Sequence, residues 1–267
     1  RQIQRDLLPK SPPLIPGFDL WGATYAAEAT GGDYFDFIRM GGDKMGLVIG
    51  DASGHGLGPA LLAADASAYL RALALTETHP SEFLADANLL LASDVGSSSF
   101  VALIFALLDP GARQLSYANA GQASGYILGA DGSVKATLES TDLPLGVDLT
   151  SRFPTMGPWT LETGDTVCLV SDGLQDSRDE SEGVFGVTRL LDALRTHLDK
   201  SAREIVEALF AEGTTFAANT PQADDITVLV VKVLERAVSR NGAPIRPMPE
   251  ALPAAGQGPH SRGNGPG

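Results

Sequence analysis

Five aspartates stand in four short segments, each beside a glycine or at the end of an apolar run: Asp33, Asp51, Asp172, Asp224 and Asp225. Taken singly, each segment is typical of a turn or a strand end, where aspartate is common. All five share the lack of a cationic neighbour in the sequence: no lysine or arginine lies within five residues of any of them. Carboxylates that gather without a cation raise one another's pKa or require a counter-ion.

Three of these aspartates adjoin predicted strands. Asp51 and Asp172 each follow an apolar run, and Asp225 begins the apolar run 226–231. If the third strand runs opposite to the other two, the three carboxylates lie together at one edge of a sheet. The sequence therefore predicts that aspartates far apart in the chain converge.

A converged set of carboxylates indicates hard divalent cations. Oxygen ligation without a local cluster of His or Cys favours Mg²⁺ or Mn²⁺ over Zn²⁺. Four or five carboxylates exceed what a single Mg²⁺ uses and suit a site with two metal ions, which activates water and stabilises phosphoryl transfer. The neighbouring glycines allow the backbone and a phosphate to approach closely.

The rest of the chain supplies the elements that must hold these residues. We expect strands at 18–37, 44–49, 100–108, 114–118, 126–128, 134–138, 166–171 and 226–234, and helices at 60–76, 80–95, 187–198 and 202–218. The segment 144–158 contains three prolines and is predicted to be a loop. Strands and helices that arrive in blocks favour an α/β fold of antiparallel sheets covered by helices.

Composition narrows the classes of function. The 267 residues carry a net charge of −14, which argues against nucleic acid or an anionic membrane as a partner. The single cysteine, Cys168, lies in an apolar run and is predicted to be a buried, inert thiol. No apolar stretch approaches the length of a membrane span, and a cytoplasmic location is expected.

Three regions are predicted along the chain. Residues 1–17 are the end of a linker helix, over 1–8, followed by a proline-rich entry segment. Residues 18–236 form the main domain. Residues 237–267 are rich in Gly and Pro and are predicted to be disordered.

Eight motifs in order give the chain a family resemblance. They are GGDYFD at 31–36, DASGHG at 51–56, NAG at 119–121, PLG at 144–146, GD at 164–165, SDGL at 171–174, FG at 185–186 and DDIT at 224–227. In this order they resemble the metal-dependent, protein phosphatase 2C-like phosphatases (PPM), in particular the bacterial branch of stage II sporulation protein E and RsbU-type proteins.

The resemblance implies a four-layer α/β/β/α sandwich with two Mn²⁺ or Mg²⁺ ions at one end. The implied ligands are Asp33 on one ion, Asp51 bridging both, the backbone carbonyl of Ala52, Asp172 and Asp224 on the other ion, and Asp225 as a ligand or a supporting group. The implied reaction is direct attack of water, activated through Asp51 and Asp172 and their metals, on phosphoserine or phosphothreonine. An anti-sigma-factor antagonist as substrate is also implied. The N-terminal helix is further predicted to connect to an upstream sensor module and to form a homodimer.

The sequence departs from the family pattern at Gln122, where the NAG motif is usually followed by His, and at 96–100, where substrate contacts could differ. Two other readings stay open. The chain could be a catalytically silent relative that binds a signalling partner, or a serine hydrolase that uses Ser53 and His55. The second has unfavourable spacing, because residues two apart on a glycine loop rarely form a base-to-nucleophile hydrogen bond.

Overall fold

The computed structural model describes residues 8–27, 31–54, 56–77, 79–94 and 99–236. The predicted helix over residues 1–8, except for Leu8, and the predicted tail 237–267 lie outside these ranges, as does His55. Leu8 packs against the hydrophobic core of the domain.

Two five-stranded sheets form the centre of the fold, and every pair of neighbouring strands is antiparallel. The first sheet has the order β1 (Phe18–Tyr25), β10 (Ile226–Val233), β9 (Thr166–Val170), β6 (Gly125–Leu128) and β7 (Val134–Leu138). The second has the order β2 (Asp33–Arg39), β3 (Met45–Ala52), β4 (Val101–Asp109), β5 (Gln114–Ala120) and β8 (Met156–Thr160).

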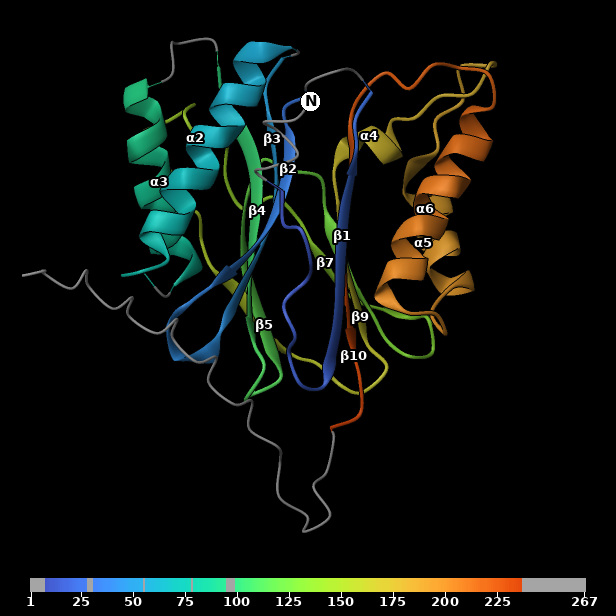
Figure 1. Cartoon of the computed structure of the whole chain (residues 1–267), viewed down its shortest axis with the longest axis horizontal. Helices are drawn as coiled ribbons and strands as arrows, with labels where there is room; N and C mark the ends of the chain where they lie inside the picture. Colours follow the sequence, from blue (N-terminus) through green and yellow to red (C-terminus); the bar gives the residue numbers. More distant parts are fainter. Residues whose placement is uncertain (1–7, 28–30, 55, 78, 95–98, 237–267) are drawn as a thin grey trace, which may run out of the picture.

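Helices cover the two outer faces. They are α2 (Leu57–Leu73) and α3 (Pro80–Asp94) on the second sheet, and α5 (Gly186–Thr196) and α6 (Ala202–Ala217) on the first, with the short α4 (Asp172–Gln175) at the end of β9. Figure 1 shows the resulting layers, helix, sheet, sheet and helix, from left to right. The predicted α/β/β/α sandwich is therefore confirmed. Within the described ranges, no helix is long and apolar enough to cross a bilayer.

Alternation along the strands explains the four layers. In β4, Leu103 and Phe105 face α2 and α3, whereas Ile104 lies between the two sheets. In β10, Val230 faces the helices α5 and α6 while Leu229 joins the layer between the sheets. Both faces of these strands are buried, so they read as unbroken apolar runs rather than as an apolar and polar alternation.

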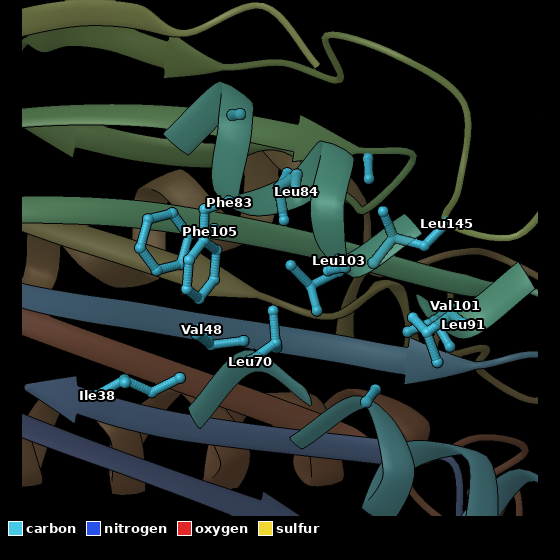
Figure 2. Packing of buried hydrophobic residues seen from close by; sticks show 14 of the residues in the cluster. Ile38, Val48, Leu70, Phe83, Leu84, Leu91, Val101, Leu103, Phe105 and Leu145 are labelled. Carbon is cyan, nitrogen blue, oxygen red and sulfur yellow. The ribbon is translucent and has the colours of Figure 1, made fainter. Parts of the chain in front are cut away.

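The core under α2 and α3 is shown in Figure 2, where side chains from the helices meet those of β2, β3 and β4. Phe83 of α3 stacks on Phe105 with 4.1 Å between the ring centroids. On the opposite side of the molecule, α6 begins with a capping box, in which Ser201 and Glu204 bond each other's backbone amides.

The structure corrects two predictions and adds one helix. The alternating segment 18–37 forms two strands in different sheets, β1 and β2, and it is β2 that makes the hairpin with β3 through the 3-10 turn η1 (Gly41–Asp43). The predicted loop 144–158 contains β8, which pairs with β5 at the edge of the second sheet. Asp172 starts the unpredicted helix α4.

The predicted meeting of aspartates at the edge of a single sheet is also wrong in detail. Asp51 belongs to β3 of the second sheet, whereas Asp172 and Asp225 adjoin β9 and β10 of the first. The chain reaches the same end of the sandwich in both sheets, at the top of Figure 1, where β3 ends, α4 begins and β10 starts. The acidic residues thus gather at a seam between two sheets.

Candidate metal centre

The hairpin of β2 and β3 supplies the first pair of acidic residues. Asp33 and Asp51 are directly opposite each other in the antiparallel register. Asp33 is only 2% exposed, and Asp51 is half-buried. The amide of Ala52 donates to the carbonyl of Gly32 at 3.2 Å, which fixes the end of the hairpin.

The first sheet supplies the remaining acids. Asp172 is the first residue of α4, directly after Ser171, and Asp224 and Asp225 precede β10. Asp172 and Asp224 are exposed, whereas Asp225 is buried. The site therefore has a buried floor at Asp33 and a rim that opens to solvent.

Electrostatics show that the five carboxylates share one neighbourhood. Burial, followed by the charges of Asp172, Asp224 and Asp225, raises the pKa of Asp51 to about 7. Burial and then the charge of Asp51 raise the pKa of Asp33 well above its ordinary value. These shifts are typical of clustered acids that lack a neutralising cation.

Desolvation by the surrounding protein, with Asp224 beside it, also raises the pKa of Asp172. The strongest charges acting on Asp51 and Asp172 are thus other carboxylates, and those acting on Asp51 come from residues that adjoin the first sheet. A divalent cation would relieve this repulsion directly.

Three glycines allow the acidic segments to touch. A Cβ atom on Gly32 would overlap the carbonyl oxygen of Ala52 and would lie 2.7 Å from Oδ1 of Asp51. A Cβ on Gly31 would overlap the Asp225 carboxylate, and one on Gly173 would overlap the Asp225 carbonyl. The glycines in the motifs at 31–36 and 171–174 are therefore required by close packing at the site.

Asp224 and Asp225 differ in what they contact. Oδ1 of Asp225 accepts a hydrogen bond from the amide of Ala27 at 2.8 Å, so this carboxylate ties the segment after β1 to the start of β10. Asp224 is exposed, and its Oδ1 accepts the amide of Asp225 at 2.8 Å. Adjacent residues in one motif thus have different surroundings.

The donor set fits hard cations. Oδ2 of Asp33 is buried and has no hydrogen-bond partner among the described residues. The oxygens nearby belong to carboxylates and to the Ala52 carbonyl, which are donors that Mg²⁺ and Mn²⁺ accept. Within the described ranges, no three His, Cys, Asp or Glu side chains are drawn together tightly enough to hold an ion by themselves.

The structure also places the residues of the alternative readings. Ser53 Oγ accepts the amide of Phe100 at 2.9 Å, and the Ser53 amide donates to the Phe100 carbonyl, which fastens the loop after β3 to the approach to β4. Its proposed partner His55 lies outside the described residues. Gln122 is buried, with its Oε1 accepting the amide of Ala123. Cys168 is fully buried, as predicted.

Comparison with known proteins assigns the family. Residues 41–234 match the family model described as stage II sporulation protein E (SpoIIE). The chain belongs to the SpoIIE family. The match lies inside the predicted domain 18–236 and includes every candidate ligand except Asp33.

The relatives of this SpoIIE-family chain include two bacterial proteins. It is 27% identical to protein IcfG of Synechocystis, with 86% of this chain and 40% of IcfG aligned. It is 26% identical to the phosphoserine phosphatase RsbU of Bacillus subtilis, with 86% of this chain and 68% of RsbU aligned. The chain thus spans less than half the length of IcfG.

A solved structure agrees with the fold of this SpoIIE-family chain. The SiaA-PP2C domain of Pseudomonas aeruginosa superposes with a TM-score of 0.75 at 27% sequence identity. The alignment covers 86% of this chain and 93% of that domain. The two-sheet architecture is therefore that of a protein phosphatase 2C-like domain.

Proposed function

We propose that this chain is a metal-dependent protein phosphatase that hydrolyses phosphoserine or phosphothreonine. The observation that carries the proposal is the meeting of five carboxylates from two sheets at one end of the sandwich, where burial and neighbouring charges raise the pKa of Asp33, Asp51 and Asp172. Membership of the SpoIIE family and the likeness to the phosphoserine phosphatase RsbU support it.

The proposed ligands follow from position and surroundings. Asp33, Asp51 and the Ala52 carbonyl would hold a cation from the side of the second sheet, and Asp172 and Asp224 from the side of the first. Two Mn²⁺ or Mg²⁺ ions, when bound, supply Lewis acidity and an activated water for phosphoryl transfer. Asp225 is proposed as a support, because its carboxylate already accepts the Ala27 amide.

The protein itself holds the proposed ligands in position and leaves the site accessible to a substrate. The buried Asp33 and the close-packed glycines hold the floor of the site rigid. Asp172 and Asp224 stand at a solvent-exposed rim, so a phosphorylated side chain carried on another protein can reach the site without entering a deep cavity.

The wider setting is proposed from the family. A small phosphoprotein, such as an anti-sigma-factor antagonist, is the proposed substrate, and the cytoplasm is the proposed location. Since the chain spans 40% of IcfG and 68% of RsbU, we propose that it is the output domain of a longer signalling protein with an upstream sensor. A homodimer through residues 1–8 is part of this proposal.

The decisive experiment measures hydrolysis of a phosphoserine peptide and of p-nitrophenyl phosphate. Activity should require Mn²⁺ or Mg²⁺, be lost in EDTA, and fall by at least about 100-fold in Asp172→Asn. Asp192→Asn is the control, because Asp192 is exposed on α5 and pairs with Arg195.

Hydrolysis that is unchanged by EDTA and by Asp172→Asn would overturn the mechanism. Failure to bind divalent ions at millimolar concentration would favour the silent binding module, and labelling of Ser53 by a fluorophosphonate would favour the serine hydrolase.

A further inference from the structure

A patch of exposed apolar side chains borders the candidate site on the side of the second sheet. Four residues define this apolar patch: Leu57 at the start of α2, Phe100 just before β4, and Leu143 and Val147 in the loop between β7 and β8. Their side chains are 39 to 67% exposed. No lysine or arginine occurs in the segments 53–70 and 139–151, which carry three of the four. Exposed apolar surface of this kind commonly marks an interaction site.

Backbone contacts place the apolar patch beside the proposed ligands. The amide of Phe100 donates to Oγ of Ser53, which follows Ala52 in the motif at 51–56, and the amide of Ser53 donates to the Phe100 carbonyl. Leu145, in the loop that carries the other patch residues, exchanges backbone hydrogen bonds with Val101 at 2.8 and 3.0 Å. Val101 lies opposite Ala52, whose carbonyl is a proposed ligand. Because neighbouring strands are about 4.8 Å apart, the patch begins within about 10 Å of the site.

The loop between β7 and β8 is fixed from beneath by a buried side chain of α3. Asn88 is 1% exposed; its Oδ1 accepts the amide of Gly146 at 2.7 Å, and its Nδ2 donates to the carbonyl of Asp148 at 2.9 Å. Leu145 of the same loop belongs to the core under α2 and α3, as does Leu91 (Figure 2). The exposed side chains therefore stand on a fixed backbone, which lowers the entropy lost when a partner binds.

The two carboxylates of this loop are bonded to the loop itself. Asp142 accepts the backbone amides of residues 152 and 153 at 2.9 and 3.2 Å. Asp148 accepts the amide and the hydroxyl of Thr150, both at 2.8 Å. A partner that reaches the site thus meets exposed carboxylates on the side of the first sheet and exposed apolar side chains on the side of the second.

These surroundings favour one kind of occupant, a segment of the phosphoprotein. A phosphorylated side chain can enter the site only if the chain that carries it lies across the site's solvent-exposed end. An extended chain rises about 3.3 Å per residue, so residues up to about three positions from the phosphoserine would reach the apolar patch. Large apolar side chains there would gain by burying the patch, whereas charged ones would lose water without gaining a partner.

We propose that Leu57, Phe100, Leu143 and Val147 form a docking surface for the phosphoprotein substrate, selecting segments with a large apolar side chain within about three residues of the phosphoserine. The inference rests on the proposed function, because it assumes that the site hydrolyses phosphoserine. It also gives a role to Phe100, which stands where the sequence departs from the family pattern.

The test compares three substrates in saturating Mn²⁺: a phosphoserine peptide with leucines on both sides of the phosphoserine, a second peptide with glycines at the same positions, and p-nitrophenyl phosphate. The wild type should hydrolyse the leucine peptide with a kcat/KM about tenfold higher than the glycine peptide. Leu143→Ser combined with Val147→Ser should reduce this preference to less than about threefold, through a raised KM. Hydrolysis of p-nitrophenyl phosphate should be unchanged, because it carries no flanking residues.

The matched control is Val187→Ser. Val187 is 40% exposed on α5, which covers the other sheet, so its replacement removes a comparable apolar side chain far from the apolar patch. This variant should keep the preference for the leucine peptide.

Urea unfolding shows whether each variant is folded, and Leu57→Ala carries the comparison if the double variant is not. The inference is overturned if the wild type hydrolyses both peptides equally, if the double variant keeps the preference, or if Val187→Ser loses it as well. It is also overturned if hydrolysis of p-nitrophenyl phosphate falls to the same extent as that of the leucine peptide.

Sedimentation velocity adds one further outcome. If the double variant changes a dimer into a monomer and leaves the peptide kinetics unaltered, the apolar patch is a contact between two copies of the chain, and the inference is wrong. In each of these cases metal-dependent hydrolysis of p-nitrophenyl phosphate by the wild type still supports the proposed function. A wild type that hydrolyses none of the three substrates overturns both.

Discussion

Asp33 and Asp51 occupy opposite positions on β2 and β3, so two carboxylates that are eighteen positions apart in sequence face each other across one hairpin. Such a like-charged pair destabilises the sheet unless a cation or a proton compensates it. A stabilising hairpin would place an opposite charge or an apolar residue there. The pair is therefore best explained by a cation that it can bind.

The two adjacent aspartates before β10 should respond differently to the loss of charge. Asp224→Asn removes a charge that acts on both Asp51 and Asp172 and should weaken Mn²⁺ binding about tenfold or more. Asp225→Asn keeps an oxygen that can accept the Ala27 amide and should have a smaller effect. Calorimetry on both variants makes the comparison, and equal losses would contradict the division of roles.

Gly32 should not tolerate a side chain. Gly32→Ala places a methyl group against the Ala52 carbonyl and 2.7 Å from Oδ1 of Asp51. We expect loss of Mn²⁺ binding and of phosphatase activity. Gly58→Ala is the control, because a Cβ there meets nothing within 4 Å in the first turn of α2 and should stabilise the helix by about 0.5 kcal/mol. A Gly32→Ala variant with wild-type affinity would show that the ligands do not need this close approach.

Arg71 should stabilise the fold through a buried partner. Its guanidinium bonds both oxygens of Asp36, at 2.7 and 3.2 Å, and the Asp36 side chain is 4% exposed. Arg71→Met leaves that carboxylate without its cation and should lower the free energy of unfolding by about 2 kcal/mol. The control Arg178→Met breaks an exposed pair with Glu182 and should cost less than about 1 kcal/mol. Urea denaturation followed by circular dichroism measures both, and equal losses would contradict the prediction.

The thiol of Cys168 should be silent in the native protein. Complete burial raises its pKa from an ordinary value of 9 to about 12. We therefore expect no labelling by a thiol reagent at pH 8 until urea unfolds the chain. Labelling of the native protein at the rate of the unfolded chain would contradict the burial.

The raised pKa of Cys168 also makes the stability of the fold depend on pH. Because the folded pKa exceeds the unfolded value, the neutral thiol contributes stability that is complete below pH 9 and is lost as the pH rises toward 12. Cys168→Ala should remove this part of the alkaline decline, about 1 kcal/mol per pH unit above 9. Unfolding free energies at pH 8 and pH 10 test it, with the difference between wild type and variant shrinking at the higher pH.

Much of the fold could be predicted because the strands buried on both faces are apolar and are bounded by glycine or aspartate. Strand β8 was missed because Pro154, Gly157 and Pro158 are typical of loops, and β8 is an edge strand whose pairing with β5 is set by tertiary contacts. Strand pairing also could not be predicted for 18–37, since local alternation does not reveal that the chain passes from one sheet to the other between Tyr25 and Asp33.

The acidic residues of the site could be predicted from their types and neighbours, but not their arrangement. Sequence spacing indicated one sheet edge, whereas Asp51 and Asp172 come from different sheets.

The seam at the end of the sandwich has a mechanical consequence. Between the sheets the contact is made by apolar side chains such as Ile104 and Leu229, which hold the two leaves together without fixing any direction. A cation bound by both Asp51 and Asp172 would add a directional link between the two sheets at one end of that apolar interface. A displacement of one sheet along the other would then first change the distances between the ion and its carboxylate ligands.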